Sequence, residues 1–435
     1  MIFFLTAAFA QEPPPVGEGI VLRPPIPEVH TLSDGTPVWL IEEHSVPLVR
    51  VEVSLRQGYL ASSDPVAALL VGGLLGADEQ SIGVGGARVW ADIEVLSGEE
   101  DAALAALRAA LLTPQLRAHQ VRRRARQLSR DRTGYVGVPG RIHNTALSEV
   151  LFPDGHPLSL RPVARDYRRV SPDRARAAWS ELLDAGRPAI LVVGDTTADT
   201  ILPMLESHLL WLGGPGVPAT LPPLDWSERS VVLVDAPGSD RSWVSLVFPA
   251  PGLDEPHLLA TEVATRVLGG DFTSRLSTVL REERGFVYDI TADLTVWPGM
   301  GRIEITCSVD NDDLIASLEA LEAVVDGMRN TPPDAAEIDA ARRAMVLQRA
   351  REMGSLAGLA AGYGTDQVYG LPPEQHRQRY LDIDALSDVS IAEAVDRFST
   401  PALWLITGDG LVIEPMLEAS AWAPDRVRSG WSVLP

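Results

Sequence analysis

The feature that most constrains the fold is an internal repeat. The segment 170–195 has the same order of residue types as the segment 389–409. Each copy reads as a helix capped by a serine, Ser171 or Ser390, followed by an apolar strand that stops at Gly-Asp. A sequence that resembles itself in this way is typical of one structural unit used twice. The repeat therefore predicts two related domains.

The elements upstream of each copy repeat as well. The runs 49–55 and 243–248 each read as a strand followed by a proline-containing turn and a helix. We expect these two helices to end near Gly76 and Gly269. Longer stretches with the apolar spacing of helices that pack on one sheet face lie at 101–127 and 333–353. This order of elements predicts an α+β fold.

A linker separates the two copies. Residues 213–223 contain too many glycines and prolines for a helix or a central strand. At 435 residues, the chain is long enough for two hydrophobic cores. The predicted organisation is a signal peptide at 1–10, an N-terminal domain at 26–212, a linker at 213–228 and a C-terminal domain at 229–420.

Composition excludes several classes of function. The chain has 59 acidic and 37 basic residues and a formal charge of −22, which repels nucleic acid and anionic lipid. All the basic residues are arginine, so the amine of a lysine is not available for Schiff-base or P-loop chemistry. The one cysteine, Cys307, lies in an apolar alternating run and is predicted to be a buried small residue.

The first ten residues carry a localisation signal. They are apolar and end in Ala8-Phe-Ala10, a small-x-small pattern that suits signal-peptide cleavage. The usual basic n-region is absent, and the alternatives are a gene model that starts late or a frayed N-terminus. The rest of the chain has no apolar run near the ~20 residues that span a bilayer. We expect a periplasmic or secreted protein without a stable membrane span.

The densest motif covers residues 268–288. It reads Gly-Gly-x-Phe-x-Ser-Arg-Leu, then Leu-Arg-Glu-x-x-Gly-x-x-Tyr. Thr273 or Ser274 can cap a helix that a glycine ends. Arg281 then falls in the last helical turn and Tyr288 on the emerging strand, where both side chains can point into one cleft.

This complete run resembles the C-terminal half of insulinase-like (pitrilysin-type) zinc metallopeptidases, and the resemblance extends over nearly the whole chain. It implies two homologous αβ domains of the LuxS and processing-peptidase type, each a mainly antiparallel sheet with helices on one face. It implies that Arg281 bonds a substrate carbonyl and that Tyr288 stabilises the oxyanion of the tetrahedral intermediate. Phe272, Ser274 and Arg275 carry over as substrate-binding residues.

The zinc site of that family is missing here. Active members carry His-x-x-Glu-His on a helix, with two zinc-binding imidazoles and a glutamate that activates water. The corresponding positions hold Ala68, Val71 and Gly72, which cannot bind a metal. No two histidines are three or four residues apart; they are His30, His44, His119, His143, His156, His208, His257 and His376. We therefore expect no cofactor in this chain.

Three further positions bear on that site. The third zinc ligand of the family would fall near Gln127. Glu149 comes a helix later and is interpreted as a residue of a solvated helix face. His156, in a Gly-His-Pro turn, resembles a structural turn residue of the family.

Two segments keep two readings each. Gly85 and Gly86 fall where the family has a turn before an edge strand that accepts an extended peptide, and the alternative is a simple glycine-rich hairpin turn. Seven arginines lie between Arg117 and Arg132, where they form either a solvated helix face or a contact for an acidic partner.

The sequence thus favours a zinc-less subunit of a heterodimeric peptidase, similar to the mitochondrial processing peptidase and its two-chain bacterial relatives. Its expected partners are a zinc-bearing homologue and an unfolded peptide. The alternative is an inactive scaffold or peptide-binding protein of the same fold. An independent peptidase with an unusual metal site is the third reading, which stoichiometric zinc in the purified chain would support.

Overall fold

The computed structural model describes residues 22–430, apart from 78–79, 115, 134–137, 187, 211–220, 223–227, 254 and 400–401. The expected signal peptide and most of the expected linker lie outside the described residues. Within the described part, no helix is long and apolar enough to cross a membrane.

The N-terminal half is built on a seven-stranded sheet, with strand order β1-β2-β7-β3-β6-β5-β4. All neighbouring strands are antiparallel except the parallel pair β2 and β7. The strands are β1 (Glu28–Thr31), β2 (Pro37–Glu42), β3 (Leu48–Leu55), β4 (Gly76–Ala77), β5 (Gln80–Val84), β6 (Val89–Leu96) and β7 (Pro188–Gly194).

The C-terminal half is built on a six-stranded sheet, with strand order β10-β11-β9-β12-β8-β13. Strand β8 pairs in parallel with β12 and β13, and the other pairs are antiparallel. The strands are β8 (Ser230–Asp235), β9 (Arg241–Ala250), β10 (Val287–Trp297), β11 (Met300–Asp310), β12 (Leu403–Gly408) and β13 (Arg426–Ser429).

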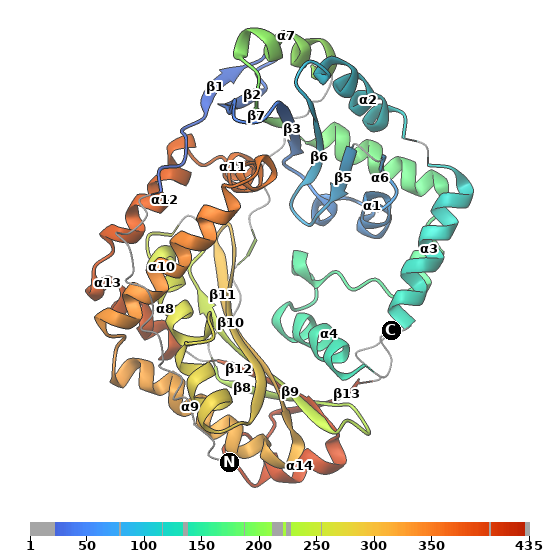
Figure 1. The fold of residues 1–435 in the computed structure, drawn as a ribbon. Helices are drawn as coiled ribbons and strands as arrows, with labels where there is room; N and C mark the ends of the chain where they lie inside the picture. The colour runs from blue at the N-terminus through green and yellow to red at the C-terminus, as the bar shows by residue number, and fades with distance from the viewer. Residues whose placement is uncertain are drawn as a thin grey trace, which may run out of the picture.

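The predicted repeat is visible in this topology. The order β2-β7-β3-β6 in the first sheet corresponds to β8-β12-β9-β11 in the second, with the same parallel and antiparallel neighbours. The apolar runs of the repeat form β7 and β12, and the runs upstream form β3 and β9. The α+β fold with two mainly antiparallel sheets is thereby confirmed (Figure 1).

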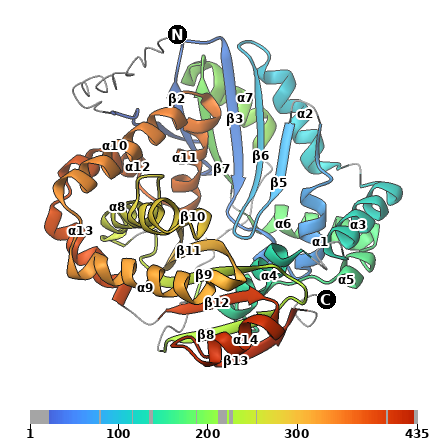
Figure 2. The same cartoon turned by 60° about the horizontal axis from the view of Figure 1, so that its bottom comes forward.

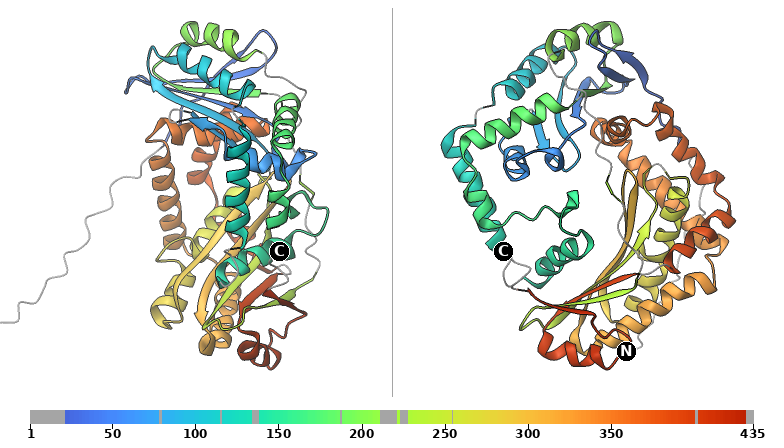
Figure 3. Two further views of the ribbon diagram at one scale, coloured as in Figure 1. Left: turned by 90° about the vertical axis from the view of Figure 1, so that its right-hand side faces the viewer. Right: turned by 180° about the vertical axis from the view of Figure 1, so that it is seen from behind.

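The helices of the N-terminal half include the short 3₁₀ turns η1 (Tyr59–Ala61) and η2 (Pro157–Ser159). The α-helices are α1 (Pro65–Gly72), α2 (Glu100–Leu112), α3 (Ala118–Thr133), α4 (Pro139–Leu151), α5 (Ala164–Arg168), α6 (Pro172–Ala185) and α7 (Ala198–Leu209). Figure 3 shows α3 running along one side of the molecule, from the N-terminal sheet toward α4.

The helices of the C-terminal half include a π-helical segment, η3 (Ser277–Glu283), and the 3₁₀ turns η4 (Asn311–Asp313) and η5 (Asp396–Ser399). The α-helices are α8 (Leu258–Gly269), α9 (Leu314–Asn330), α10 (Ala335–Glu352), α11 (Leu356–Tyr369), α12 (Pro373–Ala385), α13 (Asp388–Val395) and α14 (Gly410–Glu418).

Three predicted helix limits are wrong. The single helix expected at 101–127 is two helices, α2 and α3, and Pro114 lies between them because it has no N–H to continue a helix. Helix α13 is capped by Ser387, and Ser390 donates its own N–H to that cap at 3.1 Å. Helix α1 ends at Gly72, before β4 begins at Gly76.

One helix from the opposite half packs on part of the second face of each sheet. Alternate residues of a strand point to opposite faces. In β2 and β7, Val38, Leu40, Ile190 and Val192 belong to the N-terminal core. Their neighbours Trp39, Ile41, Leu191 and Val193 pack against α11 of the C-terminal half, through Leu356, Leu359, Ala360 and Tyr363.

The reciprocal contact is made by α4 of the N-terminal half. Its apolar residues, Ile142, Ala146, Leu147 and Leu151, pack against Val232, Val234, Leu403 and Leu405 of the C-terminal sheet. Figure 2 shows α4 lying against β9 and β12. The prediction of helices on only one face of each sheet is therefore incomplete. The exchange explains why β7 and β12 are apolar without alternation, since both of their faces are buried.

Candidate functional site

The motif at 268–288 begins with a buried cap and continues as an unusual helix. Ser274 is 5 % exposed, and its hydroxyl accepts the N–H of Ser277 at 3.4 Å, so the predicted capping role falls to Ser274. The helix continues as the π-helical segment η3. Its end is marked by Gly285, which adopts φ +68°, a left-handed conformation that favours glycine. π-Helical turns are rare and recur at functional sites.

Arg281, Tyr288 and Phe272 come together at the surface. The guanidinium carbon of Arg281 lies 4.8 Å from the centre of the Phe272 ring and 5.8 Å from that of Tyr288. Phe272 is 75 % exposed and Tyr288 is 86 % exposed. Cation–π contacts of this kind are worth about 0.5–1 kcal/mol at exposed sites. These contacts therefore hold the guanidinium of Arg281 beside the phenol of Tyr288 at a solvent-accessible place.

A β-bulge aims Tyr288 outward. The pairing of β10 with β11 shifts register between Val287 and Ile290, both of which are buried. Tyr288 and Asp289 lie between them and are both exposed. A bulge of this type re-aims side chains and is common next to active sites.

Arg275 is engaged inside the protein. Its Nε and Nη2 donate to the two carboxylate oxygens of Glu337, both at 2.7 Å, and its Nη1 donates to the carbonyl of Thr331 at 2.8 Å. Arg275 holds the pKa of Glu337 below its usual value, mainly through this hydrogen bonding. The bidentate pair ties the motif to the start of α10, and the substrate-binding role inferred for Arg275 and Ser274 stays a prediction.

The three positions that correspond to the missing zinc motif, Ala68, Val71 and Gly72, are closely packed against neighbouring residues. Ala68 and Val71 on α1 are fully buried. A methyl group added at Gly72 would lie 2.8 Å from the backbone nitrogen of Val84, so this glycine permits α1 to approach β5 closely. In the described part of the chain, no group of three or more His, Cys, Asp or Glu side chains could hold a metal ion.

An arginine lies beside this helix. A methyl group added at Gly73 would meet the guanidinium of Arg124 at 2.5 Å, so Arg124 of α3 leans over the end of α1. The neighbouring arginines Arg122, Arg123, Arg126 and Arg130 are exposed, as on a solvated helix face. Gln127 is also exposed.

Glu149 is not on a solvated face, and that interpretation is wrong. Its carboxylate lies 3.0 Å from Nη1 of Arg428 on β13, and its side chain is only 16 % exposed. The ion pair forms because α4 packs on the C-terminal sheet, where β13 is the edge strand. Glu149 therefore joins the two halves.

His156 has the structural turn role expected for it. It is 8 % exposed, its Nδ1 accepts the N–H of Leu158 at 3.1 Å, and its ring stacks on Phe152. Its Nε2 lies 3.2 Å from the carbonyl of Pro222.

Gly85 and Gly86 form a hairpin turn whose carbonyls accept hydrogen bonds from another segment of the same domain. Their carbonyls accept the N–H groups of Tyr59 at 2.9 Å and Leu60 at 3.1 Å. A methyl group added at Gly58 would lie 2.2 Å from the Gly85 carbonyl, so the contact requires a glycine at 58. Peptide binding at Gly85 and Gly86 stays a prediction, beside the simpler reading of a glycine-rich turn.

Sequence reasoning missed His143, which contacts both halves of the chain. It is fully buried on α4, and its ring nitrogens contact the hydroxyls of Thr407 at 2.9 Å and Ser245 at 2.8 Å. Burial lowers the pKa of His143 to about 3, so the ring is neutral at physiological pH. A signal for its burial is present in the sequence, because His143 lies within the apolar face of α4, alongside Ile142, Ala146 and Leu147.

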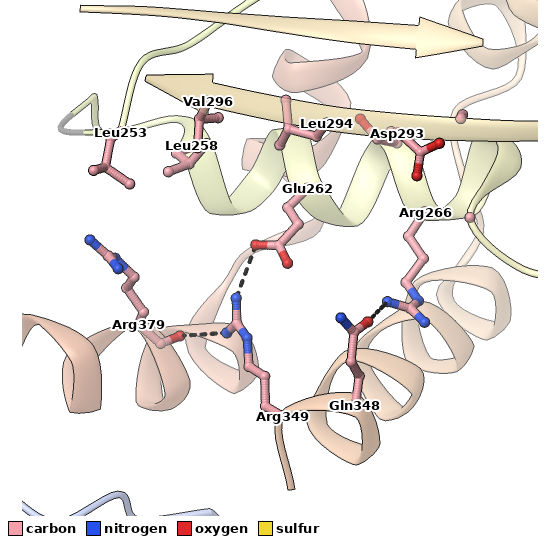
Figure 4. Close-up of a pocket in the computed structure, with 13 residues that line it drawn as sticks. Leu253, Leu258, Glu262, Arg266, Asp293, Leu294, Val296, Gln348, Arg349 and Arg379 are labelled. Atoms are coloured by element: carbon pink, nitrogen blue, oxygen red, sulfur yellow. Dashed lines mark hydrogen bonds and ion pairs between the residues drawn. The ribbon is translucent and has the colours of Figure 1, made fainter. Parts of the chain in front are cut away.

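One cavity on the helical side of the C-terminal half has a volume of about 400 Å³. Each of its three guanidiniums is neutralised. Arg349 lies 3.0 Å from Glu262, and Arg266 contacts Gln348 (Figure 4). Arg266 also donates to Asp271 at 2.8 Å. Arg379 donates to Asp366 at 2.8 Å. These pairs join α8 to α10 and α11 to α12, and they leave little charge for a ligand.

The cysteine has the predicted structural role. Cys307 lies buried on β11, and burial raises the pKa of its thiol to about 12. A thiol that stays protonated at neutral pH is a poor nucleophile. Cys307 therefore contributes packing and is not a reactive group.

Comparison with known proteins shows a similarity over part of the chain. Residues 169–345 match the model of the family described as "Peptidase M16 inactive domain". No curated protein matches the chain.

Solved structures share the fold across most of the chain. A peptidase M16 inactive domain from Pseudomonas fluorescens has 19 % identity and a TM-score of 0.77, covering 88 % of this chain and 97 % of that one. A chain of complex III2 from Candida albicans has 14 % identity and a TM-score of 0.72, with coverages of 88 % and 96 %.

A third neighbour is the periplasmic protease PqqL from Escherichia coli, at 13 % identity and a TM-score of 0.71. The match covers 93 % of this chain but 48 % of PqqL, so the chain spans about half the length of that protease. These matches show that the chain has the two-domain fold of M16-like proteins and that residues 169–345 are similar to the peptidase M16 inactive domain family.

Proposed function

We propose that the chain is the non-catalytic subunit of a heterodimeric insulinase-like metallopeptidase, with zinc held by the partner subunit. The observation that carries this proposal is the cluster of Arg281, Tyr288 and Phe272 at the surface of a chain whose zinc positions are packed shut. Arg281 and Tyr288 would act on a peptide bound in the partner's active site.

The chemistry of the two groups suits that role. A guanidinium is a fixed, always charged donor that can bond a peptide carbonyl, and a phenol can donate to a developing oxyanion. The guanidinium can hold the peptide before the reaction, and the phenol is most useful where negative charge develops during it. Without a metal to activate water, the chain alone would bind peptides without cleaving them.

An exported location would fit this function. The neighbour PqqL is described as a periplasmic protease, and the first ten residues have the pattern of a signal peptide. We therefore propose that the subunit works in the periplasm or outside the cell.

The proposal is tested by co-expressing the chain with a zinc-motif homologue and measuring hydrolysis of a quenched-fluorescent peptide. Hydrolysis should require both chains, and the variant with Arg281→Ala and Tyr288→Phe should lower kcat by about 10²-fold or more, as loss of oxyanion donors does. Arg284→Ala is the matched control, because Arg284 is exposed at the end of the same helix. Activity that persists in the double variant would contradict the proposal.

The second candidate is an inactive scaffold or peptide-binding protein, favoured by the likeness to a chain of complex III2. A scaffold would associate with a partner without adding to hydrolysis. The same co-expression separates the two, because a scaffold predicts complex formation with no change in activity on replacing Arg281 and Tyr288.

A further inference from the structure

A second cavity lies between the two halves, apart from Arg281 and Tyr288. Its volume is about 610 Å³. The N-terminal half contributes Tyr59 of η1, the end of α3 and one side of α4. The C-terminal half contributes Trp297 at the end of β10 and Arg302 on β11. A ligand here would touch both domains.

The lining of this cavity is strongly basic. It holds four guanidiniums, and its described lining contains no carboxylate; the arginines are Arg132, Arg141, Arg161 and Arg302. In the 400 Å³ cavity, by contrast, carboxylates lie among the guanidiniums. A concentration of positive charge is unexpected in a chain with a net charge of −22. A concave surface lined by one sign of charge attracts ligands of the opposite sign.

Two of these arginines are held in place and partly desolvated. Arg161 donates to the carbonyls of Ser148 at 3.0 Å and Phe152 at 2.6 Å, and burial lowers the pKa of its guanidinium. Arg302 lies 2.9 Å from Glu304 and over the ring of Trp297. The Nε atoms of Arg161 and Arg302 are buried without a hydrogen-bond partner. Arg161 also lies 3.9 Å from Asp154, so both guanidiniums have a carboxylate nearby, and a bound anion would add a further acceptor on the cavity side.

The remaining walls suit a peptide better than a bare anion. Phe152, Leu158, Leu160 and Trp297 give the cavity an apolar side, and Asn144 and Thr145 offer an amide and a hydroxyl. An acidic side chain, or a terminal carboxylate, carried on a chain with apolar neighbours would satisfy both kinds of surface.

Tyr59 connects this cavity to the predicted peptide-binding turn. Its side chain lines the cavity, and its N–H donates to the Gly85 carbonyl at 2.9 Å. A methyl group added at Gly86 would lie 3.6 Å from the Tyr59 hydroxyl. A peptide that follows the turn would therefore reach the basic cavity.

We propose that this cavity binds a carboxylate of an acidic peptide and so selects the peptides that the chain accepts. The inference rests on the proposed function in one respect, namely that peptides enter the space between the halves. It adds the class of peptide and the residues that choose it.

The test uses the full chain and a short fluorescein-labelled peptide with several glutamates, beside the same peptide with glutamines. Fluorescence anisotropy should show at least about tenfold tighter binding of the acidic peptide, a difference that salt reduces. The variant Arg132→Gln with Arg141→Gln should remove the preference, and Arg141→Lys should keep most of it.

The matched control is Arg122→Gln with Arg123→Gln, which removes the same charge from the exposed face of α3. It should leave binding unchanged, and thermal unfolding should show all variants folded. Equal binding of the two peptides, or equal losses in control and cavity variants, would overturn the inference. Inorganic phosphate that binds as tightly as the acidic peptide would overturn it too, because the site would then recognise a bare anion.

Failure of this inference is distinguishable from failure of the proposed function. If the two-chain enzyme cleaves glutamate and glutamine peptides equally well, the proposed function is supported and the selection of acidic peptides by the cavity is contradicted. If the acidic peptide binds as expected but replacing Arg281 and Tyr288 leaves hydrolysis unchanged, the selection by the cavity is supported and the proposed function is contradicted.

Discussion

His143 of α4 and Ser245 of β9 lie 2.8 Å apart, although they belong to opposite halves of the chain. The Ser245 hydroxyl donates to Glu304 at 3.0 Å, so it accepts from Nε2 of His143. Nδ1 then accepts the hydroxyl of Thr407 at 2.9 Å. These bonds fix one neutral tautomer of a buried imidazole, and Glu304 connects it in turn to Arg302 in the basic cavity.

The first prediction concerns the pH dependence of stability. The pKa of His143 is about 3 in the folded protein and about 6.5 in an unfolded chain. Between these values the unfolded chain binds one more proton, so stability falls as the pH falls below about 6.5. For this one group, the slope of the unfolding free energy is at most ~1.4 kcal/mol per pH unit.

Chemical denaturation from pH 7.5 to pH 4.5 measures this slope, with His143→Gln as the comparison. The variant should be less stable than the wild type at pH 7.5, because the hydroxyls of Ser245 and Thr407 lose their imidazole partner. On acidification, however, it should lose less stability than the wild type does. Other titrating groups contribute equally to both proteins. Parallel curves for the two proteins would show that His143 does not titrate on unfolding in this way.

The second prediction concerns the closed zinc helix. Gly72→Ala places a methyl group 2.8 Å from the Val84 nitrogen and 2.9 Å from its Cβ, and should cost about 1–3 kcal/mol by overpacking. The control is Gly327→Ala on α9, where an added methyl group has no neighbour within 4 Å. There the change should stabilise by about 0.5–1 kcal/mol. Urea denaturation measures both, and equal effects would contradict the close approach of α1 and β5.

The third prediction separates two arginines of one motif. Arg275→Ala removes a bidentate, partly buried pair with Glu337 and should destabilise the chain by about 1–3 kcal/mol. Arg281→Ala removes contacts with two exposed aromatic rings and a 3.5 Å ion pair with the exposed Glu282, and should cost less than about 1 kcal/mol. Denaturant unfolding of both variants checks this order. The reverse order would mean that Arg281, and not Arg275, anchors the motif.

The sequence predicted the parts of this fold that depend on local pattern. The repeat, the strands β3, β7, β9 and β12 and the cap at Ser274 follow from alternation, apolar runs and turn residues. The motif also predicted that Arg281 and Tyr288 would lie together, and η3 and β10, which carry them, are in contact in the C-terminal half.

Features that depend on contacts between distant segments were not predictable. The ion pair of Glu149 with Arg428 and the buried place of His143 exist because α4 crosses to the other sheet. The basic cavity combines arginines from residues 132–161 of the N-terminal half with Arg302 of β11, which is far away in the chain. Residue periodicity identifies an apolar helix face but does not say which sheet it covers.

The last prediction follows from the exchange of α4 and α11. Each helix covers a sheet face of the opposite half, and Gln367 of α11 donates to the carbonyl of Ile190 at 2.9 Å. A fragment covering residues 22–222 would expose the face of Trp39 and Leu191, and a fragment covering 228–430 would expose that of Val232 and Leu405. Exposed faces of this kind lead to aggregation.

Each fragment expressed alone should therefore aggregate or unfold without cooperativity, whereas the two expressed together should form a soluble complex that unfolds in one transition. Size-exclusion chromatography and thermal unfolding of the co-expressed pair measure this. The double variant Leu359→Asp with Tyr363→Asp should prevent association, because it places charge against the buried face of the N-terminal sheet. The control is a pair of exposed residues on the same helix: Ala357→Asp with Ala361→Asp should leave the complex intact. Cooperative unfolding of either fragment alone would show instead that the halves are independent domains and that the exchange of helices is not needed for folding.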